Sequence, residues 1–191
     1  MTDYYSPFLD VDVSRETYDA LTAYQRLLEK WTTRINLISK STHDDVWVRH
    51  ICDSAQVMAL ASPHARHWVD IGSGGGLPGL VVAILAKELN PQLRVTLIES
   101  DQRKAVFLRT VVRELQLSAT VQAKRIEAVG PLKADIISAR ALAELNDLLR
   151  MTHSFMVENT QCLFMKGKKW SKEVKEAEKR WKFQAERFIS K

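Results

Sequence analysis

The stretch VDIGSGGGLPG, residues 69–79, is the part of the chain whose residue types and spacing best suit the binding of a ligand. Glycine lets the backbone adopt positive φ angles and approach a bound molecule closely. A short apolar run precedes the stretch and a helix-like apolar run follows it, so we expect a turn between a strand and a helix. Five of the seven glycines of the chain lie here: Gly72, Gly74, Gly75, Gly76 and Gly79.

Two classes of cofactor fit this turn. The G-x-G-x-x-G spacing of residues 74–79 matches the dinucleotide pattern, in which a pyrophosphate lies at a helix N-terminus. The D-x-G-x-G-x-G spacing of residues 70–76 is typical of sites for S-adenosylmethionine (SAM). The methionine part of SAM carries an ammonium group beside a sulfonium, which the carboxylate of Asp70 would favour. Glu99, which ends the next predicted strand, could accept hydrogen bonds from both ribose hydroxyls of either cofactor.

Strand-like and helix-like segments alternate around the turn. This order predicts an α/β fold with a parallel, doubly wound sheet, whose ligands bind at the carboxyl ends of the strands. The predicted strands cover residues 67–74, 94–100, 119–127, 134–142 and 162–168, with a possible sixth at 182–190. The predicted helices between them cover residues 77–89, 101–115, 143–157 and 171–181.

Residues 1–62 predict a helical extension ahead of a core that spans residues 63–191. Ser14 resembles a helix N-cap, and apolar residues follow it at helical spacing. A second helix is expected from about residue 42 to about residue 60, before Pro63.

Charge and composition narrow the class of protein. The 191 residues carry a net charge of +5, and residues 166–191 hold ten Lys and Arg against four Glu. This basic tail could contact a polyanion, or it could be a solvated lysine-rich helix. The longest apolar run has ten residues, against about 18 for a membrane span. The N-terminus does not read as a signal peptide, and the two cysteines form no C-x-x-C pair. We therefore expect a cytoplasmic protein without a membrane partner.

Seven motifs follow one another over residues 24–170: YQRLLEKWTTRINLIS, VRHICDS, VDIGSGGGLPGL, LIESDQRKAVFLR, the stretch Arg125–Glu127, ISARALAELNDLL and FMKGK. Their order and spacing resemble the bacterial ribosomal RNA small-subunit methyltransferase G family, also called glucose-inhibited division protein B. The resemblance implies a class I SAM-dependent methyltransferase with a Rossmann-like, mostly parallel sheet and an N-terminal helical extension. It implies methyl transfer to N7 of one guanine in 16S ribosomal RNA (rRNA), with S-adenosylhomocysteine as the product. It also implies a seventh strand, for which the sequence before Lys191 offers no obvious candidate.

The resemblance also implies roles for individual residues. Together with the turn pattern, it gives a cofactor site of Asp70, Gly72, Gly74, Gly76, Leu77, Glu99, Ile126, Glu127 and Arg140. Glu99 stands where family members often have aspartate. The residues expected to position the guanine are Asn36, His50, Asp53 and Arg140. The resemblance also places Lys104 and Arg125 in the polar lining of the cleft. Because RNA binding is mainly electrostatic, we expect Lys104, Arg125, Lys166, Lys168 and Lys169 to contact RNA.

Several of these residues also have structural interpretations. His50 and Asp53 lie one helical turn apart and could instead tie the extension to the sheet. Asn36 could cap a turn, and Arg140 could belong to a structural ion pair. Lys166 could reach the cleft or begin the basic tail.

The proposed chemistry needs few catalytic groups. Guanine N7 is an acceptor with a free lone pair, so no proton has to be removed before a methyl group is transferred. The enzyme has to hold N7 in line with the methyl group, and we expect no general base, nucleophile or metal. The expected partner is 16S rRNA, as free RNA, small subunit or assembly intermediate, bound by a monomer. The alternatives are a class I methyltransferase for another RNA or a small molecule, an NAD-dependent oxidoreductase, and a non-catalytic RNA-binding module.

Overall fold

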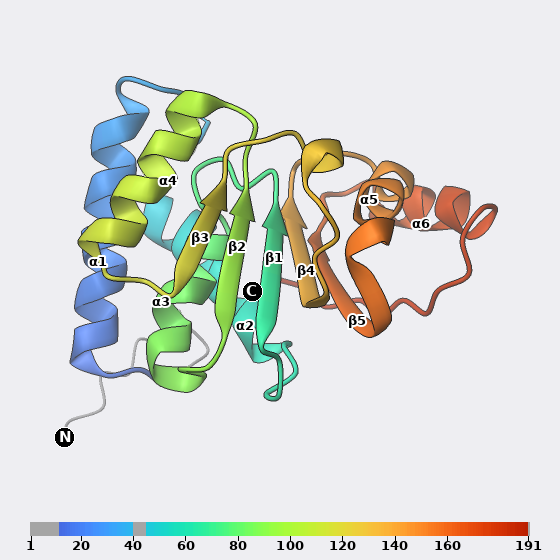
Figure 1. Cartoon of the computed structure of the whole chain (residues 1–191), viewed down its shortest axis with the longest axis horizontal. Helices are drawn as coiled ribbons and strands as arrows, with labels where there is room; N and C mark the ends of the chain where they lie inside the picture. The colour runs from blue at the N-terminus through green and yellow to red at the C-terminus, as the bar shows by residue number, and fades with distance from the viewer. Residues whose placement is uncertain (1–11, 40–44, 191) are drawn as a thin grey trace.

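The computed structural model describes residues 12–39 and 45–190 of the chain. Its centre is a sheet with the strand order β3-β2-β1-β4-β5, in which every neighbouring pair is parallel (Figure 1). The strands are β1 (His67–Ile71), β2 (Arg94–Ile98), β3 (Ala119–Gln122), β4 (Ala134–Arg140) and β5 (Met156–Met165). The chain builds outward from β1 to β3 and then returns to place β4 beside β1. The switch point of the topology therefore lies between β1 and β4, as a doubly wound sheet requires.

Helices cover both faces of the sheet (Figure 1). They are α1 (Arg15–Thr32), α2 (Asp53–Ala59), α3 (Gly79–Leu89), α4 (Gln102–Glu114), α5 (Leu145–Thr152) and α6 (Trp170–Glu178). A π-helical segment, Trp47–Cys52, leads directly into α2, and two 3₁₀ turns occupy Ile126–Ala128 and His153–Phe155. Among the described residues, no helix is both long enough and apolar enough to cross a membrane.

Side-chain alternation along the strands produces two hydrophobic layers. Trp68 and Leu97 pack in the larger core, which also contains residues of α1, α2, α3 and α4. Val69 and Ile98, their neighbours in sequence, point to the opposite face and pack with α5. The helices of the N-terminal extension thus share one core with the strands.

Two helices of the larger layer begin at capping side chains, one of which is predicted from the sequence. The hydroxyl of Ser14 accepts a hydrogen bond from the Thr17 amide at 3.3 Å, which confirms the N-cap predicted for α1. The Asp101 carboxylate caps α4 by accepting from the Arg103 amide at 2.8 Å. Side chains at these positions satisfy amides that have no partner inside the helix.

Some elements differ from the prediction. β3 ends at Gln122, because the Lys124 amide turns back to the Gln122 carbonyl at 2.9 Å. β5 begins at Met156, well before the predicted residue 162, since the segment pairs with the full length of β4. The predicted helix near residues 42–60 begins in π-helical form, and its expected first residues, 42–44, lie outside the described residues.

The possible strand at residues 182–190 has no regular structure. Phe188 and Ile189 are 59% and 73% exposed, so no neighbouring strand covers them. The sheet of the described residues therefore has five strands. The fold class predicted from the sequence is confirmed, because these strands alternate with helices and run parallel.

Candidate active site

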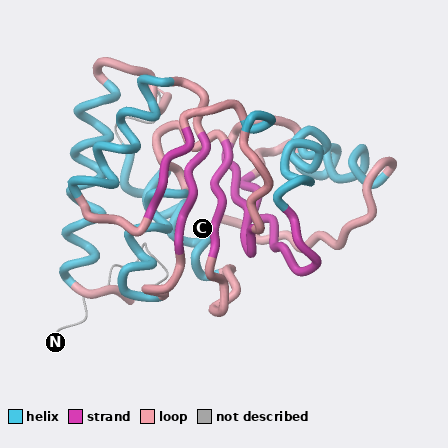
Figure 2. The backbone as a smooth tube through the Cα atoms, in the orientation of Figure 1, coloured by secondary structure: helices cyan, strands magenta, loops and turns pink. Residues whose placement is uncertain are grey.

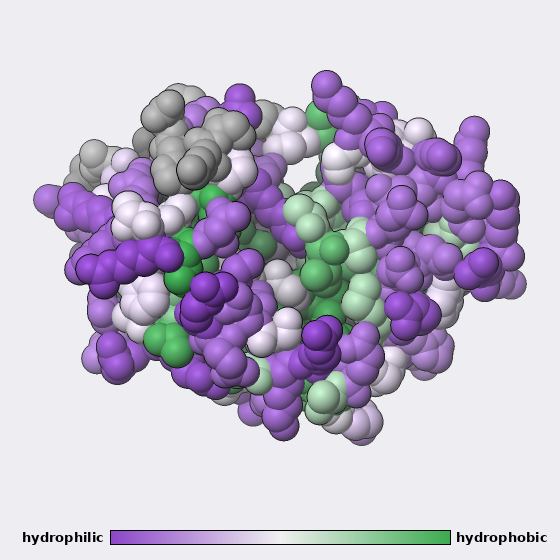
Figure 3. All heavy atoms as spheres, turned by 90° about the horizontal axis from the view of Figure 1, so that it is seen from above, coloured by the Kyte–Doolittle hydropathy of each residue, from purple (hydrophilic) through white to green (hydrophobic). Residues whose placement is uncertain are grey.

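A cavity of about 610 Å³ opens at the carboxyl ends of β1, β2 and β4. Loops gather at this edge of the sheet (Figure 2), and hydrophilic residues dominate the surface around it when the molecule is seen from above (Figure 3). The volume lies within the range of about 300–1,000 Å³ typical of small-molecule sites. The lining residues are Leu37, Ile38, Ser39, His50, Gly72, Ser73, Gly74, Gly75, Leu77, Ile98, Glu99, Ser100, Lys104, Lys124, Arg125, Ile126, Glu127, Arg140, Ala141, Leu142 and Met151.

The glycine turn between β1 and α3 forms the floor of the cavity. Gly72, Gly74 and Gly76 have backbone φ angles of 63°, 53° and 88°, which residues other than glycine rarely adopt. Gly79 is required for a different reason, because a Cβ there would lie 2.7 Å from the Oδ2 atom of Asp70. The turn thus needs glycine for backbone conformation and for close packing of α3 on β1, and its backbone is bare where it borders the cavity.

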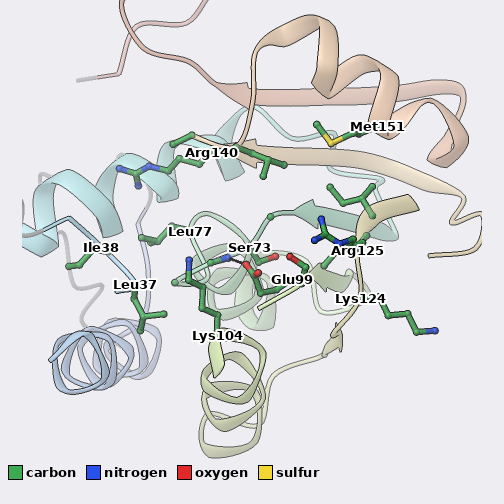
Figure 4. Close-up of a pocket in the computed structure, with 18 of the residues that line it drawn as sticks. Leu37, Ile38, Ser73, Leu77, Glu99, Lys104, Lys124, Arg125, Arg140 and Met151 are labelled. Atoms are coloured by element: carbon green, nitrogen blue, oxygen red, sulfur yellow. Dashed lines mark hydrogen bonds between the residues drawn. The ribbon is translucent and has the colours of Figure 1, made fainter. Parts of the chain in front are cut away.

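Glu99 holds the glycine turn from the side of β2. Its Oε2 atom accepts a hydrogen bond from the Gly74 amide at 2.8 Å, and its Oε1 atom accepts from the Asp101 amide at 2.8 Å. The side chain lines the cavity beside Ser73 (Figure 4). Each carboxylate oxygen can accept a second hydrogen bond, so Glu99 can still receive ribose hydroxyls.

Asp70 lies beneath the turn and is fully buried. Its Oδ1 atom accepts from the Ser138 hydroxyl at 2.6 Å, and that hydroxyl accepts from the Trp68 indole at 2.7 Å. Asp70 does not line the cavity, so the structure gives it no direct access to the ammonium group of a ligand. Burial raises the pKa of Asp70 to about 6, against the lowering effect of the Ser138 hydrogen bond. Its side chain binds Ser138 of β4 and packs against Gly79 at the start of α3, so it joins these elements beneath the turn.

Arg140, at the end of β4, joins the sheet to the helical extension. Its Nη2 atom donates to the Arg49 carbonyl and to Nδ1 of His50, both at 2.9 Å, and lies 3.4 Å from the Asp53 carboxylate. Arginine only donates, so His50 Nδ1 is the acceptor and the ring is in a neutral form. Burial, with the nearby Arg140 charge, lowers the pKa of His50 to about 4. The Nη1 atom of Arg140 is buried and has no hydrogen-bond partner among the described residues.

The predicted site residues divide into those that border the cavity and those that do not. Leu77, Ile126, Glu127, Lys104 and Arg125 border it, together with Gly72, Gly74, Glu99, His50 and Arg140. Gly76 and Asp53 do not border the cavity themselves. Gly76 belongs to the glycine turn that does, and Asp53 pairs with Arg140, which does. Asn36 is exposed outside the cavity, and its neighbour Leu37 borders it instead.

The basic residues after β5 lie outside the cavity. The Lys166 ammonium contacts Glu173 at 2.6 Å and donates to the Ala143 carbonyl at 2.7 Å. It therefore fastens α6 to the loop after β4, and the idea that it reaches the cleft is not supported. Lys168 and Lys169 are exposed in the turn that follows and do not border the cavity.

Sequence reasoning missed several cavity residues. Leu37, Ile38 and Ser39 come from the segment after α1, and Leu142 and Met151 come from the region after β4. Apolar residues at such positions carry no signal of their own in a sequence. Lys124 was not predicted as a cavity residue either. Its position beside Arg125, near the end of a predicted strand, is the sequence signal that indicates it.

Acid should change stability through Asp70 and His50 in opposite directions. The raised pKa of Asp70 lets the folded state bind a proton between about pH 6 and 4 that the unfolded state lacks, so this group favours folding as the pH falls. The lowered pKa of His50 means that below about pH 6.5 the unfolded state binds a proton that the folded state lacks, so this group disfavours folding as the pH falls. For each pH unit over which only one of the two states binds the proton, the free energy of unfolding changes by up to about 1.4 kcal/mol.

Urea unfolding of Asp70→Asn at pH 7 and pH 5 measures the first effect. From pH 7 to pH 5, the free energy of unfolding of the wild type should rise by about 1 kcal/mol relative to this variant. For His50→Gln the relative change should have the opposite sign. A difference between wild type and Asp70→Asn that does not vary with pH would show that Asp70 is ionised in the folded protein.

Solved structures of similar architecture define the fold. A ribosomal protein L11 methylase from Lactobacillus delbrueckii subsp. bulgaricus has a TM-score of 0.55 and 19% identity, covering 73% of this chain and 74% of that one. An O-methyltransferase described as putative, from Klebsiella pneumoniae, has a TM-score of 0.53 and 14% identity, covering 84% and 76%. The fold is that of a class I SAM-dependent methyltransferase.

Sequence comparison then gives the family. The profile described as rRNA small subunit methyltransferase G matches residues 17–190. Ribosomal RNA small subunit methyltransferase G of Ruegeria sp. (strain TM1040) is 50% identical over 182 residues, which is 95% of this chain and 88% of that protein. The protein of that name from Rhodospirillum centenum is 47% identical over 190 residues, 100% of this chain and 84% of that protein. The chain therefore belongs to the rRNA small subunit methyltransferase G family, and the resemblance found in its motifs is confirmed.

Proposed function

We propose that this protein transfers the methyl group of SAM to N7 of a guanine in 16S rRNA. One observation carries the proposal: in a member of this family, a SAM-type glycine turn and Glu99 border a cavity that also exposes Lys104 and Arg125. In the reaction, the bond between sulfur and the methyl carbon breaks and a bond from N7 to that carbon forms. The positive charge passes from the sulfonium to the guanine ring, and S-adenosylhomocysteine remains.

The residues around the cavity fit SAM. Bound there, SAM supplies an electrophilic methyl group. Glu99 offers carboxylate oxygens for ribose hydroxyls, and the backbone of Gly72 and Gly74, which borders the cavity without side chains, admits a ligand closely. Ile126 and Glu127 lie on the 3₁₀ turn after β3 and would flank the adenine. The carboxylate of Asp70 acts by supporting the turn rather than by contacting the ammonium group.

The cluster of Arg140, His50 and Asp53 would position the guanine. Arg140 borders the cavity, and its guanidinium could donate to guanine O6 or to a phosphate. His50 and Asp53 hold the guanidinium in place.

Calorimetric titration with SAM and with NAD tests the class of reaction. The cavity should bind SAM and should show no comparable affinity for NAD, since the chain belongs to a methyltransferase family and its glycine turn has the D-x-G-x-G-x-G spacing of SAM sites. Binding of NAD without any response to SAM would favour an oxidoreductase. Labelled methyl groups should then enter 16S rRNA and not 23S rRNA, whereas binding of SAM without transfer to RNA would indicate a different methyl acceptor.

Binding of RNA should depend on the basic residues at the mouth of the cavity. Arg125 is exposed there, beside Lys124. A plot of log affinity against log salt concentration has a negative slope, and each phosphate contact makes it steeper by about 0.7–0.9. Arg125→Ala should therefore weaken RNA binding and make this slope shallower by about that amount. The control is Arg94→Ala, because Arg94 is exposed at the opposite end of β2. Equal salt slopes for Arg125→Ala and the wild type would remove Arg125 from the RNA contact.

We further propose that the protein acts as a monomer in the cytoplasm. The support is that one chain supplies the glycine turn, Glu99 and the Arg140 cluster that border the cavity. A ribosomal substrate also places the reaction where ribosomes assemble. Light scattering at the concentration used for methylation tests the oligomeric state, and a stable dimer would contradict it.

A further inference from the structure

The glycine turn is held from the side of the N-terminal extension as well as from the sheet. The hydroxyl of Tyr24, in the middle of α1, donates to the carbonyl oxygen of Gly75 at 2.6 Å. Tyr24 is fully buried, so water does not compete for this hydrogen bond. Burial also raises the pKa of the phenol, which keeps the hydroxyl protonated and able to donate.

The packing around Gly75 is a second, independent sign of this contact. A Cβ at Gly75 would lie 3.2 Å from Cδ1 of Leu28 on α1 and 3.3 Å from the carbonyl oxygen of Leu37. Gly75 has no positive φ, unlike its neighbours Gly74 and Gly76. Its lack of a side chain is therefore explained by space: the extension lies directly against the turn at this residue.

The extension also forms part of the cavity wall. Leu37 and Ile38 follow α1 and lie along one side of the cavity, away from Met151 in the view of Figure 4. On the other side of the same turn, Glu99 binds the Gly74 amide at 2.8 Å. Consecutive residues of the turn, Gly74 and Gly75, are thus tied to the residue that follows β2 by one hydrogen bond and to α1 by another.

We infer that Tyr24 is a positioning residue for SAM: its hydroxyl fixes the Gly75 peptide, and so places the backbone of the turn at the geometry that binds the cofactor. The inference rests on the proposed function of the turn as the SAM site. It assigns the helical extension a part in cofactor binding. Without the hydroxyl, the Gly75 carbonyl lacks its donor and the turn is free to shift before SAM binds.

The test compares Tyr24→Phe with Thr17→Val by calorimetric titration with SAM. Phenylalanine keeps the packed ring and removes the hydroxyl. Thr17 lies on the same helix, is also buried, and donates to Glu88 of α3 at 2.7 Å, away from the cavity. Tyr24→Phe should weaken SAM binding about tenfold, whereas Thr17→Val should lower the melting temperature and leave SAM affinity within twofold of the wild type.

A kinetic measurement separates positioning from stability. Assayed below the melting temperature of either variant, Tyr24→Phe should raise the KM for SAM about tenfold with a kcat close to that of the wild type. An unchanged KM would overturn the inference. An equal rise in KM for Thr17→Val would also overturn it, because the effect would then come from loosened packing of α1.

Hydrogen exchange on the wild-type protein provides a test that needs no variant. Coupling between two sites is reciprocal, so SAM should slow amide exchange in residues 21–28 of α1 as well as in residues 72–79. Protection confined to residues 72–79 would contradict a role for Tyr24 while leaving the SAM site in place. If the wild type does not bind SAM at all, the proposed function itself fails.

Discussion

Glu99→Ala is expected to weaken SAM binding about 100-fold. The carboxylate would accept the ribose hydroxyls, and it already fixes the glycine turn through the Gly74 amide and the start of α4 through the Asp101 amide. A hydrogen bond to a charged group contributes about 1.5–3 kcal/mol, and a tenfold change in affinity corresponds to about 1.4 kcal/mol. Loss of the ribose contacts, with a looser turn, therefore gives two orders of magnitude. Calorimetric titration with SAM or S-adenosylhomocysteine measures it.

Glu88→Ala is the matched control for this substitution. Glu88 also ties two elements together, because its carboxylate accepts from the Ser14 amide and hydroxyl and from the Thr17 hydroxyl. It lies away from the cavity, so its removal should destabilise the protein and spare SAM affinity. Unchanged SAM affinity in a folded Glu99→Ala protein would remove Glu99 from the cofactor site.

Arg140→Lys is expected to reduce kcat/KM for RNA methylation about 100-fold. The Nη2 atom of Arg140 donates to the Arg49 carbonyl and to the His50 ring, and it pairs with the Asp53 carboxylate. The Nη1 atom makes no hydrogen bond within the described residues. A lysine ammonium is a compact charge without the planar fork, so it cannot reproduce these contacts together. Two lost hydrogen bonds of about 1.5 kcal/mol each are enough for this effect.

The control for Arg140→Lys is Arg150→Lys. Arg150 is exposed on α5 and pairs with Asp147 at 3.4 Å, so lysine should replace it without loss of activity. Steady-state methylation of 16S rRNA by both variants makes the comparison, with melting temperatures recorded for each. If Arg140→Lys retains activity within fivefold of the wild type, the arginine is a structural link between β4 and the extension and does not position the guanine.

The parts of this site that the sequence predicts well are those in which local patterns determine the geometry. Positive φ angles at Gly72, Gly74 and Gly76 follow from a glycine-rich turn between a strand and a helix. The place of Glu99 follows from its position at the end of the next parallel strand. The ends of neighbouring parallel strands meet at one edge of the sheet, so the sequence positions of these residues imply their proximity.

The parts it does not predict depend on contacts between distant segments. Tyr24 fits the apolar spacing of α1 like any core residue, and its bond to Gly75 spans 51 positions of the sequence. Asp70 has a residue type suited to an ammonium ligand, but the packing of α3 on β1 buries it. Lys166 has the charge to bind RNA, but its ammonium group forms a salt bridge with Glu173 on α6. Periodicity and spacing contain no information on such pairings.

Borohydride and aniline cleavage of 16S rRNA tests the central claim most directly, because it breaks the chain at a guanine methylated on N7. RNA from cells that carry the gene should show one cleavage that disappears when the gene is deleted. The wild-type gene should restore this cleavage and Glu99→Ala should not. The same cleavage pattern with and without the gene would contradict the account.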